Sequence, residues 1–137
     1  MPTITVGRHL AVEDALAGAR SPHKIRFAPG SRDAIAASAK RIREAVEAGV
    51  WIYGVNTGFG SNADRRISAE DASELQANLL RSHAFGDGPP LADDVVRLAL
   101  LLRIHALSQG HSGIRPKTLR ALIRLYERDV LPVVPSR

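Results

Sequence analysis

The sequence predicts a mainly α-helical fold with a short extended start, on three observations. Apolar side chains recur on one face at helical spacing across residues 31–49. Helix stop and start signals divide the chain, with Pro29-Gly30-Ser31 ahead of that segment and Pro116 at the first position of a later one. Residues 98–102 are all apolar and lie within another helical segment, which is typical of a buried helix.

The elements follow in order along the chain. Residues 3–6 are predicted to be extended, and a helical turn follows near residues 12–19. The next helix is expected to have Ser31 as its N-cap and to end near Gly49. The aromatic and β-branched run Trp51–Val55 predicts a short extended segment, and the glycines after it predict a loop. Three further helices are expected, over about 69–84, over about 92–110 and from Pro116 onward, before an extended end at 131–135.

The apolar run at residues 98–102 also bears on how complete the chain is. Consecutive apolar residues point outward all round a helix, so such a helix is expected to be covered on every side. A chain of 137 residues with so few elements can rarely provide that cover. We therefore expect the chain to be incomplete alone and to belong to a larger helical bundle or a homo-oligomer.

Composition and charge narrow the functional classes. With 45% apolar and 24% charged residues, the chain resembles one ordinary soluble domain. The net charge of +5 raises the question of nucleic-acid binding. However, the basic residues from Lys117 to Arg128 form a stripe opposite an apolar face, and this pattern favours a solvated helix face. No nucleic-acid partner is expected.

Cysteine content, apolar stretches and histidine spacing indicate the expected cellular location and metal content of the protein. The chain has no cysteine, which excludes disulfides and thiolate nucleophiles within it. Its start lacks the apolar segment of a secretory signal, and no apolar stretch is long enough for a membrane span, so we expect a cytoplasmic protein without membrane contact. Its five histidines lack metal-ligand spacing, so no metal site is expected.

Three segments carry a resemblance to a known family. The first is the loop Tyr-Gly-Val-Asn-Thr-Gly-Phe-Gly at 53–60, the second is the helical segment 75–86 with its Ser82-His83 pair, and the third is the segment 102–115. In this order and spacing they resemble the aromatic amino acid ammonia-lyases and related aminomutases. The Ser82-His83 pair is most similar to the histidine-specific branch. The resemblance extends from about Leu10 to Arg137.

The resemblance implies the fold and the cofactor of the complete enzyme. The fold would be the amino-terminal helical region of the ammonia-lyases, in the fumarase/aspartase-like superfamily, with residues 1–137 ending just before the segment that forms the prosthetic group. That group, methylidene-imidazolone (MIO), is made from an internal Ala-Ser-Gly, and this chain contains no Ala-Ser-Gly. The isolated chain is therefore expected to be inactive and to need the remainder of the enzyme or further copies of itself.

The resemblance assigns Tyr53 as the catalytic base. Elimination of ammonia requires removal of a weakly acidic proton from the substrate β-carbon, which a phenolate can accept. A tyrosine phenol ordinarily has a pKa of about 10, so a nearby positive charge or hydrogen-bond donor would have to lower it. Outside this motif, a half-buried structural tyrosine would be the simpler interpretation.

The resemblance also assigns substrate-binding residues. His83 would bind the substrate side chain, since one imidazole can recognise another through a hydrogen bond, although a histidine at a helix end is more often a cap. Apart from the resemblance, the glycines Gly58 and Gly60 are expected to bring their backbone amides close to the substrate carboxylate. His105 stands where the family usually has asparagine, and a core histidine is its simpler interpretation.

The sequence leaves several functions open beside elimination of ammonia from L-histidine to give urocanate. One alternative is a lyase or aminomutase for tyrosine or phenylalanine. Another is a noncatalytic protein, either a truncated relative or an assembly factor. The last is a small basic nucleic-acid binder, which salt-dependent binding would reveal.

Overall fold

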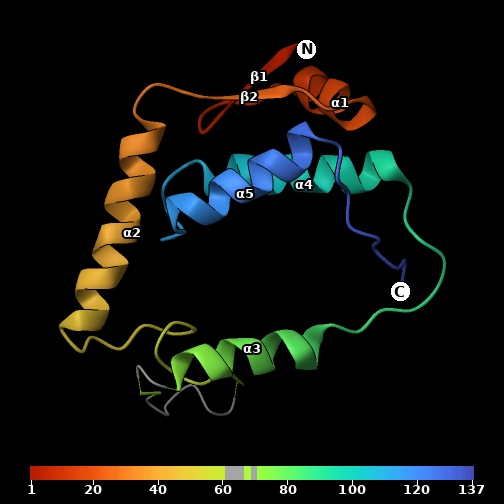
Figure 1. Ribbon diagram of the computed structural model, residues 1–137. Helices are drawn as coiled ribbons and strands as arrows, with labels where there is room; N and C mark the ends of the chain where they lie inside the picture. Colours follow the sequence, from red (N-terminus) through yellow and green to blue (C-terminus); the bar gives the residue numbers. More distant parts are fainter. Residues whose placement is uncertain (61–66, 69–70) are drawn as a thin grey trace. The chain divides into compact units, whose positions relative to one another are not determined.

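The computed structural model describes residues 1–60, 67–68 and 71–137, which form two compact units (Figure 1). The first unit comprises residues 1–41 and 87–137, and the second comprises residues 42–86. The elements are, in order, β1 (Thr3–Val6), α1 (Val12–Arg20), β2 (Lys24–Phe27), α2 (Ser31–Glu47), α3 (Ala72–His83), α4 (Asp93–Leu107) and α5 (Pro116–Glu127). The prediction of a mainly helical chain is confirmed.

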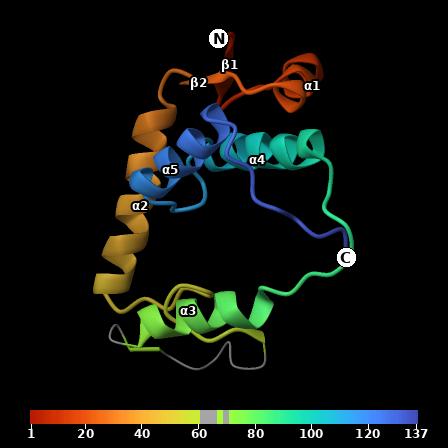
Figure 2. The same cartoon turned by 45° about the vertical axis from the view of Figure 1, so that its right-hand side comes forward.

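Two short strands open the first unit. β1 and β2 pair in parallel, with Thr3 opposite Lys24 and Val6 opposite Phe27, and α1 connects them. β1 was predicted from the sequence, whereas β2 was not. Helix α1 packs against α4, and α5 packs against both α4 and β2, as both views show (Figures 1 and 2).

The hydrophobic core lies in the first unit. Its buried members are Ile4, Val6, Ile35, Leu101, Ile104, Leu107, Leu119, Ile123 and Tyr126. Gly18 lets α1 approach this core closely, because a Cβ atom there would lie 2.5 Å from Leu101 Cδ2 and 2.8 Å from Ile4 Cδ1. The buried side chains of α5 recur at helical spacing, so the predicted apolar face of that helix is confirmed.

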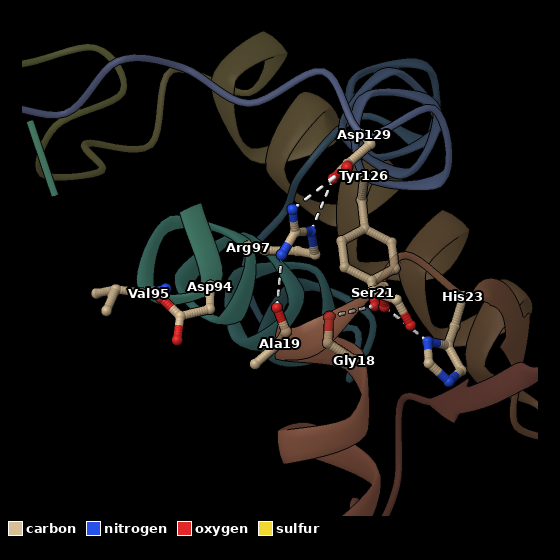
Figure 3. A network of polar contacts seen from close by, with 9 residues as sticks. All are labelled: Gly18, Ala19, Ser21, His23, Asp94, Val95, Arg97, Tyr126 and Asp129. Atoms are coloured by element: carbon tan, nitrogen blue, oxygen red, sulfur yellow. Dashed lines mark hydrogen bonds and ion pairs between the residues drawn. The ribbon is translucent and has the colours of Figure 1, made fainter. Parts of the chain in front are cut away.

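A polar network at the C-terminal end of α1 joins three segments of the first unit (Figure 3). The guanidinium of Arg97 donates to both carboxylate oxygens of Asp129, at 2.7 and 3.2 Å, and to the Ala19 carbonyl at 2.6 Å. The hydroxyl of Tyr126 donates to the Gly18 carbonyl at 3.0 Å. Carbonyls at the end of a helix lack partners within the helix, so these side chains supply them.

Electrostatics in this network favour the charge state that the hydrogen bonds need. The hydrogen bond that Arg97 donates to Asp129 raises the pKa of Arg97, although burial acts against it. Burial raises the pKa of Tyr126, which keeps its hydroxyl proton available for the Gly18 carbonyl. Asp129 adopts a φ of 54°, a left-handed conformation that aspartate tolerates better than most residues.

Helix α4 is only partly covered by the rest of the first unit. Leu101 and Ile104 are fully buried, whereas Leu102 is 45% exposed and Val95 is 49% exposed. The helices that pack most extensively against α4 are α1 and α5. The expectation that a chain of this size cannot cover this helix on every side is therefore confirmed for this unit. None of the helices in the described residues is long and apolar enough to cross a bilayer.

Two local predictions were wrong. Ser31 is the first, buried residue of α2 rather than its N-cap. Gly30 takes the capping position, since its carbonyl accepts from the Ala34 amide at 3.0 Å and its φ is +80°. Residues 51–55 form no strand, because the amides of Val55 and Asn56 bond back to the Ile52 carbonyl and turn the chain. The predicted start of the third helix near residue 69 lies outside the described residues.

His105 is a half-buried histidine of α4. Burial lowers the pKa of His105, and the charge of nearby His9 lowers it further. Its Nδ1 atom is buried and has no hydrogen-bond partner among the residues that the structure describes, while Nε2 lies 3.4 Å from the Gln109 amide nitrogen. A ring in these surroundings is more stable neutral than charged.

We expect stability to fall as the pH drops below about 6.5, where an unperturbed histidine gains a proton. Folded His105 takes up its proton at lower pH than unfolded His105, so acid favours the unfolded state. His105→Asn should reduce this fall in urea-unfolding midpoints measured from about pH 8 to pH 5. His111→Asn, at an exposed position, is the control and should behave like the wild type. An undiminished fall in His105→Asn would contradict the expectation.

Candidate functional site

The tyrosine loop, which comprises residues 53–60 of the second unit, is organised by Asn56. The side chain of Asn56 accepts a hydrogen bond from the Ile52 amide at 2.8 Å and donates to the Val50 carbonyl at 2.8 Å. Thr57 also stabilises the loop, because its hydroxyl accepts a hydrogen bond from the Gly54 amide at 3.2 Å. Asn56 and Thr57 are both buried, at 8% and 3% exposure, so polar contacts rather than an apolar core hold this loop.

Tyr53 projects from this loop into solvent. Its side chain is 65% exposed, and its ring meets the Phe59 ring edge-on with centroids 6.0 Å apart. The Gly60 amide donates a long hydrogen bond of 3.5 Å to the Tyr53 hydroxyl. Gly60 adopts a φ of 56°, which a side chain would strain. The structure therefore brings two predicted site residues, Tyr53 and Gly60, into contact.

His83 is the last residue of α3 and is exposed. Its Nδ1 atom lies 2.9 Å from the Leu79 carbonyl oxygen and 3.0 Å from the Ser82 hydroxyl. The Ser82 hydroxyl in turn donates to the Leu79 carbonyl at 3.0 Å. Within the described part of the chain, no hydrogen bond joins His83 to Tyr53 or Gly60. The imidazole is thus held to its own helix through Nδ1.

An open groove of about 470 Å³ lies between the loop and α3 in the second unit. Its lining residues are mostly apolar: Gly58, Phe59, Ile67, Leu75, Asn78, Leu79 and Ser82. Tyr53 packs on one lining residue, Phe59, and His83 contacts another, Ser82. The volume lies in the range of small-molecule sites. Leu75 and Leu79 line this groove, whereas Gln76 between them is exposed.

Some contributors to the site were not predicted from the sequence. The hydrogen bonds by which the side chains of Asn56 and Thr57 hold the loop were not predicted, although asparagine and threonine next to glycines are a known turn signal. Phe59 belongs to the loop motif and had no predicted role of its own, yet it packs on Tyr53 and lines the groove. Across the residues that the structure describes, no three His, Asp or Glu side chains gather where they could hold a metal ion.

The helical architecture and a tyrosine on a glycine-rich loop define the class of protein. A sequence model of the aromatic amino acid lyases matches residues 10–137. The chain therefore belongs to the aromatic amino acid lyase family, and the fold is that of the family's amino-terminal region.

The chain is similar to individual members of this family, among them histidine ammonia-lyases and a tyrosine aminomutase. The chain is 42% identical to a histidine ammonia-lyase of Symbiobacterium thermophilum, across 100% of this chain and 27% of that protein. The structure matches histidine ammonia-lyase of Trypanosoma cruzi with a TM-score of 0.87 and 30% identity, over 100% of this chain and 27% of that one. It also matches tyrosine aminomutase of Streptomyces globisporus with a TM-score of 0.90 and 31% identity. That match covers 98% of this chain and 26% of the aminomutase chain. The chain thus spans about a quarter of the length of the proteins it matches.

Proposed function

We propose that this chain forms part of a histidine ammonia-lyase, in which it supplies the catalytic base and a contact to the substrate side chain. The observation that carries the proposal is the exposed Tyr53 hydroxyl beside the Gly60 amide, in a chain 42% identical to a histidine ammonia-lyase. The Ser82-His83 pair supports histidine as the substrate. The reaction would convert L-histidine to urocanate and ammonia.

The proposed role of Tyr53 is to take a proton from the substrate β-carbon. Its hydroxyl is solvent-exposed, so a substrate can reach it, and the Gly60 amide and the Phe59 ring restrict its movement. A base fixed in position before the substrate arrives contributes through orientation as well as proton transfer. Gly60 is proposed to hold the phenol oxygen in the free enzyme and to turn its amide toward the substrate carboxylate in the complex.

The electrophile of the family would have to come from elsewhere. MIO makes the amino group of the substrate a better leaving group, and it forms from an Ala-Ser-Gly that these 137 residues do not contain. No side chain of this chain can replace it. The roles that remain for this chain are proton removal and substrate binding, and we propose that a segment outside these residues completes the site, within a homo-oligomer.

A hybrid enzyme tests the proposal. In it, this chain replaces the matching amino-terminal quarter of the Symbiobacterium thermophilum histidine ammonia-lyase. We expect urocanate formation from histidine, followed by its ultraviolet absorbance, for the hybrid and none for the 137-residue chain alone. A folded hybrid that carries the electrophile but turns over no histidine, tyrosine or phenylalanine would contradict the proposal and favour a noncatalytic protein.

An aminomutase is the second candidate. The TM-score of 0.90 with tyrosine aminomutase of Streptomyces globisporus favours it. Product analysis separates the two, because a lyase releases ammonia and an unsaturated acid, whereas an aminomutase returns an isomeric amino acid.

A further inference from the structure

We infer that Ser82 is a positioning residue that, together with the Leu79 carbonyl, fixes the proton of His83 on Nδ1. Nε2 of His83 is then a hydrogen-bond acceptor, and it selects a substrate whose side chain carries an N–H or O–H donor. This inference rests on the proposed role of His83 in substrate binding and adds which atom binds and what chemistry it accepts.

The Leu79 carbonyl oxygen can only accept hydrogen bonds. Two polar atoms approach it, the Ser82 hydroxyl at 3.0 Å and His83 Nδ1 at 2.9 Å. An imidazole nitrogen without a proton would place its lone pair against the carbonyl lone pairs at that distance. Both contacts therefore need a donor, and Nδ1 must carry the proton.

The Ser82 oxygen completes the arrangement. Its single proton is directed to Leu79, so its lone pairs face His83 Nδ1 at 3.0 Å and share the Nδ1 proton. The imidazole of His83 thus has two acceptors on one edge. In a neutral ring with Nδ1 protonated, Nε2 has no proton and accepts.

An acceptor at Nε2 discriminates among aromatic amino acids. The imidazole of histidine and the phenol of tyrosine each have a donor to offer, whereas the phenyl ring of phenylalanine has none. A site with an acceptor left unpaired disfavours the ligand that lacks the donor. The geometry therefore favours histidine or tyrosine over phenylalanine.

The first arm of the test measures the tautomer in the 137-residue chain itself. Nitrogen-15 NMR of the His83 ring, at about pH 8 where an ordinary imidazole is neutral, distinguishes a protonated from an unprotonated ring nitrogen. We expect a protonated Nδ1 in the wild type and in Ser82→Thr, which keeps the hydroxyl. Ser82→Ala should shift both nitrogens toward intermediate values. A protonated Nε2 in the wild type, or no change in Ser82→Ala, would overturn the inference.

The second arm measures selectivity in the hybrid enzyme. Ser82→Ala should raise KM for histidine roughly two- to fivefold, because a smaller fraction of the enzyme has Nε2 free to accept, and should leave kcat within about twofold. Ser82→Thr should restore KM, and Ser112→Ala, at an exposed serine of the first unit, should leave KM unchanged. An unchanged KM in Ser82→Ala would overturn the recognition step. A hybrid without any activity would count against the proposed function alone, because the NMR arm decides the tautomer independently.

Discussion

Tyr53→Phe is expected to reduce kcat of the hybrid enzyme for histidine by about two to four orders of magnitude, the contribution of a positioned general base. The substitution removes the phenol oxygen, whereas the ring that meets Phe59 edge-on stays. The lost hydrogen bond from Gly60 is long, at 3.5 Å and exposed, so the melting temperature should not change measurably. The measurement is urocanate formation at saturating histidine, together with thermal unfolding of the same preparation.

The second tyrosine of the chain supplies the matched control. Tyr126 is fully buried and donates to the Gly18 carbonyl, so Tyr126→Phe leaves a buried acceptor without its partner. This should cost about 1–2 kcal/mol of stability while turnover is retained. Tyr53→Phe is thus expected to lower turnover without loss of stability, and Tyr126→Phe to lower stability without loss of turnover. Turnover in Tyr53→Phe within a few-fold of the wild type would contradict the assignment of Tyr53 as base.

Arg97→Ala is expected to have the largest effect on stability. The guanidinium side chain is 8% exposed and binds both Asp129 oxygens, so truncation leaves the Ala19 carbonyl and the carboxylate without their donor. Removing one partner of a buried ion pair costs about 3–5 kcal/mol, and we expect the lower end because Asp129 is 43% exposed. The melting temperature should fall by about 10 °C.

The control for Arg97 is another arginine of the same unit. Arg128 is exposed, and Arg128→Ala should change the free energy of unfolding by no more than about 0.5 kcal/mol. Asp129→Ala should destabilise as well, because the guanidinium stays buried without its carboxylate. A melting temperature of Arg97→Ala within about 2 °C of the wild type would show that the network contributes little.

Much of the fold was predictable because its signals are local. Pro116 opens α5 as predicted, and the periodic apolar residues of α2 and α5 form helices close to the expected bounds. Strand β2 could not be predicted in the same way, because Lys24–Phe27 is short and its partner β1 lies about twenty residues earlier. Parallel pairing is a nonlocal property that a short segment does not encode.

The wrong prediction at residues 51–55 and the unpredicted burial of Arg97 have a similar physical cause. The aromatic and β-branched residues of that run favour a strand, but the Asn56 side chain bonds to Ile52 and Val50 and turns the backbone instead. Arg97 interrupts an apolar segment and gives no sign of burial in the sequence, since its partner Asp129 lies 32 residues later. The tyrosine loop could be located from its motif, whereas the contact between Gly60 and Tyr53 required the folded loop.

The network at the end of α1 has a consequence for synthesis on the ribosome. The carbonyls of Gly18 and Ala19 receive their partners from Tyr126 and Arg97, and Arg97 is neutralised by Asp129. At about 5–20 residues per second, translation from residue 20 to residue 129 takes roughly 5–20 s. During that interval the nascent helix α1 has exposed terminal carbonyls and an incomplete neighbour, so a chaperone that binds emerging chains would meet this segment well before it can dock.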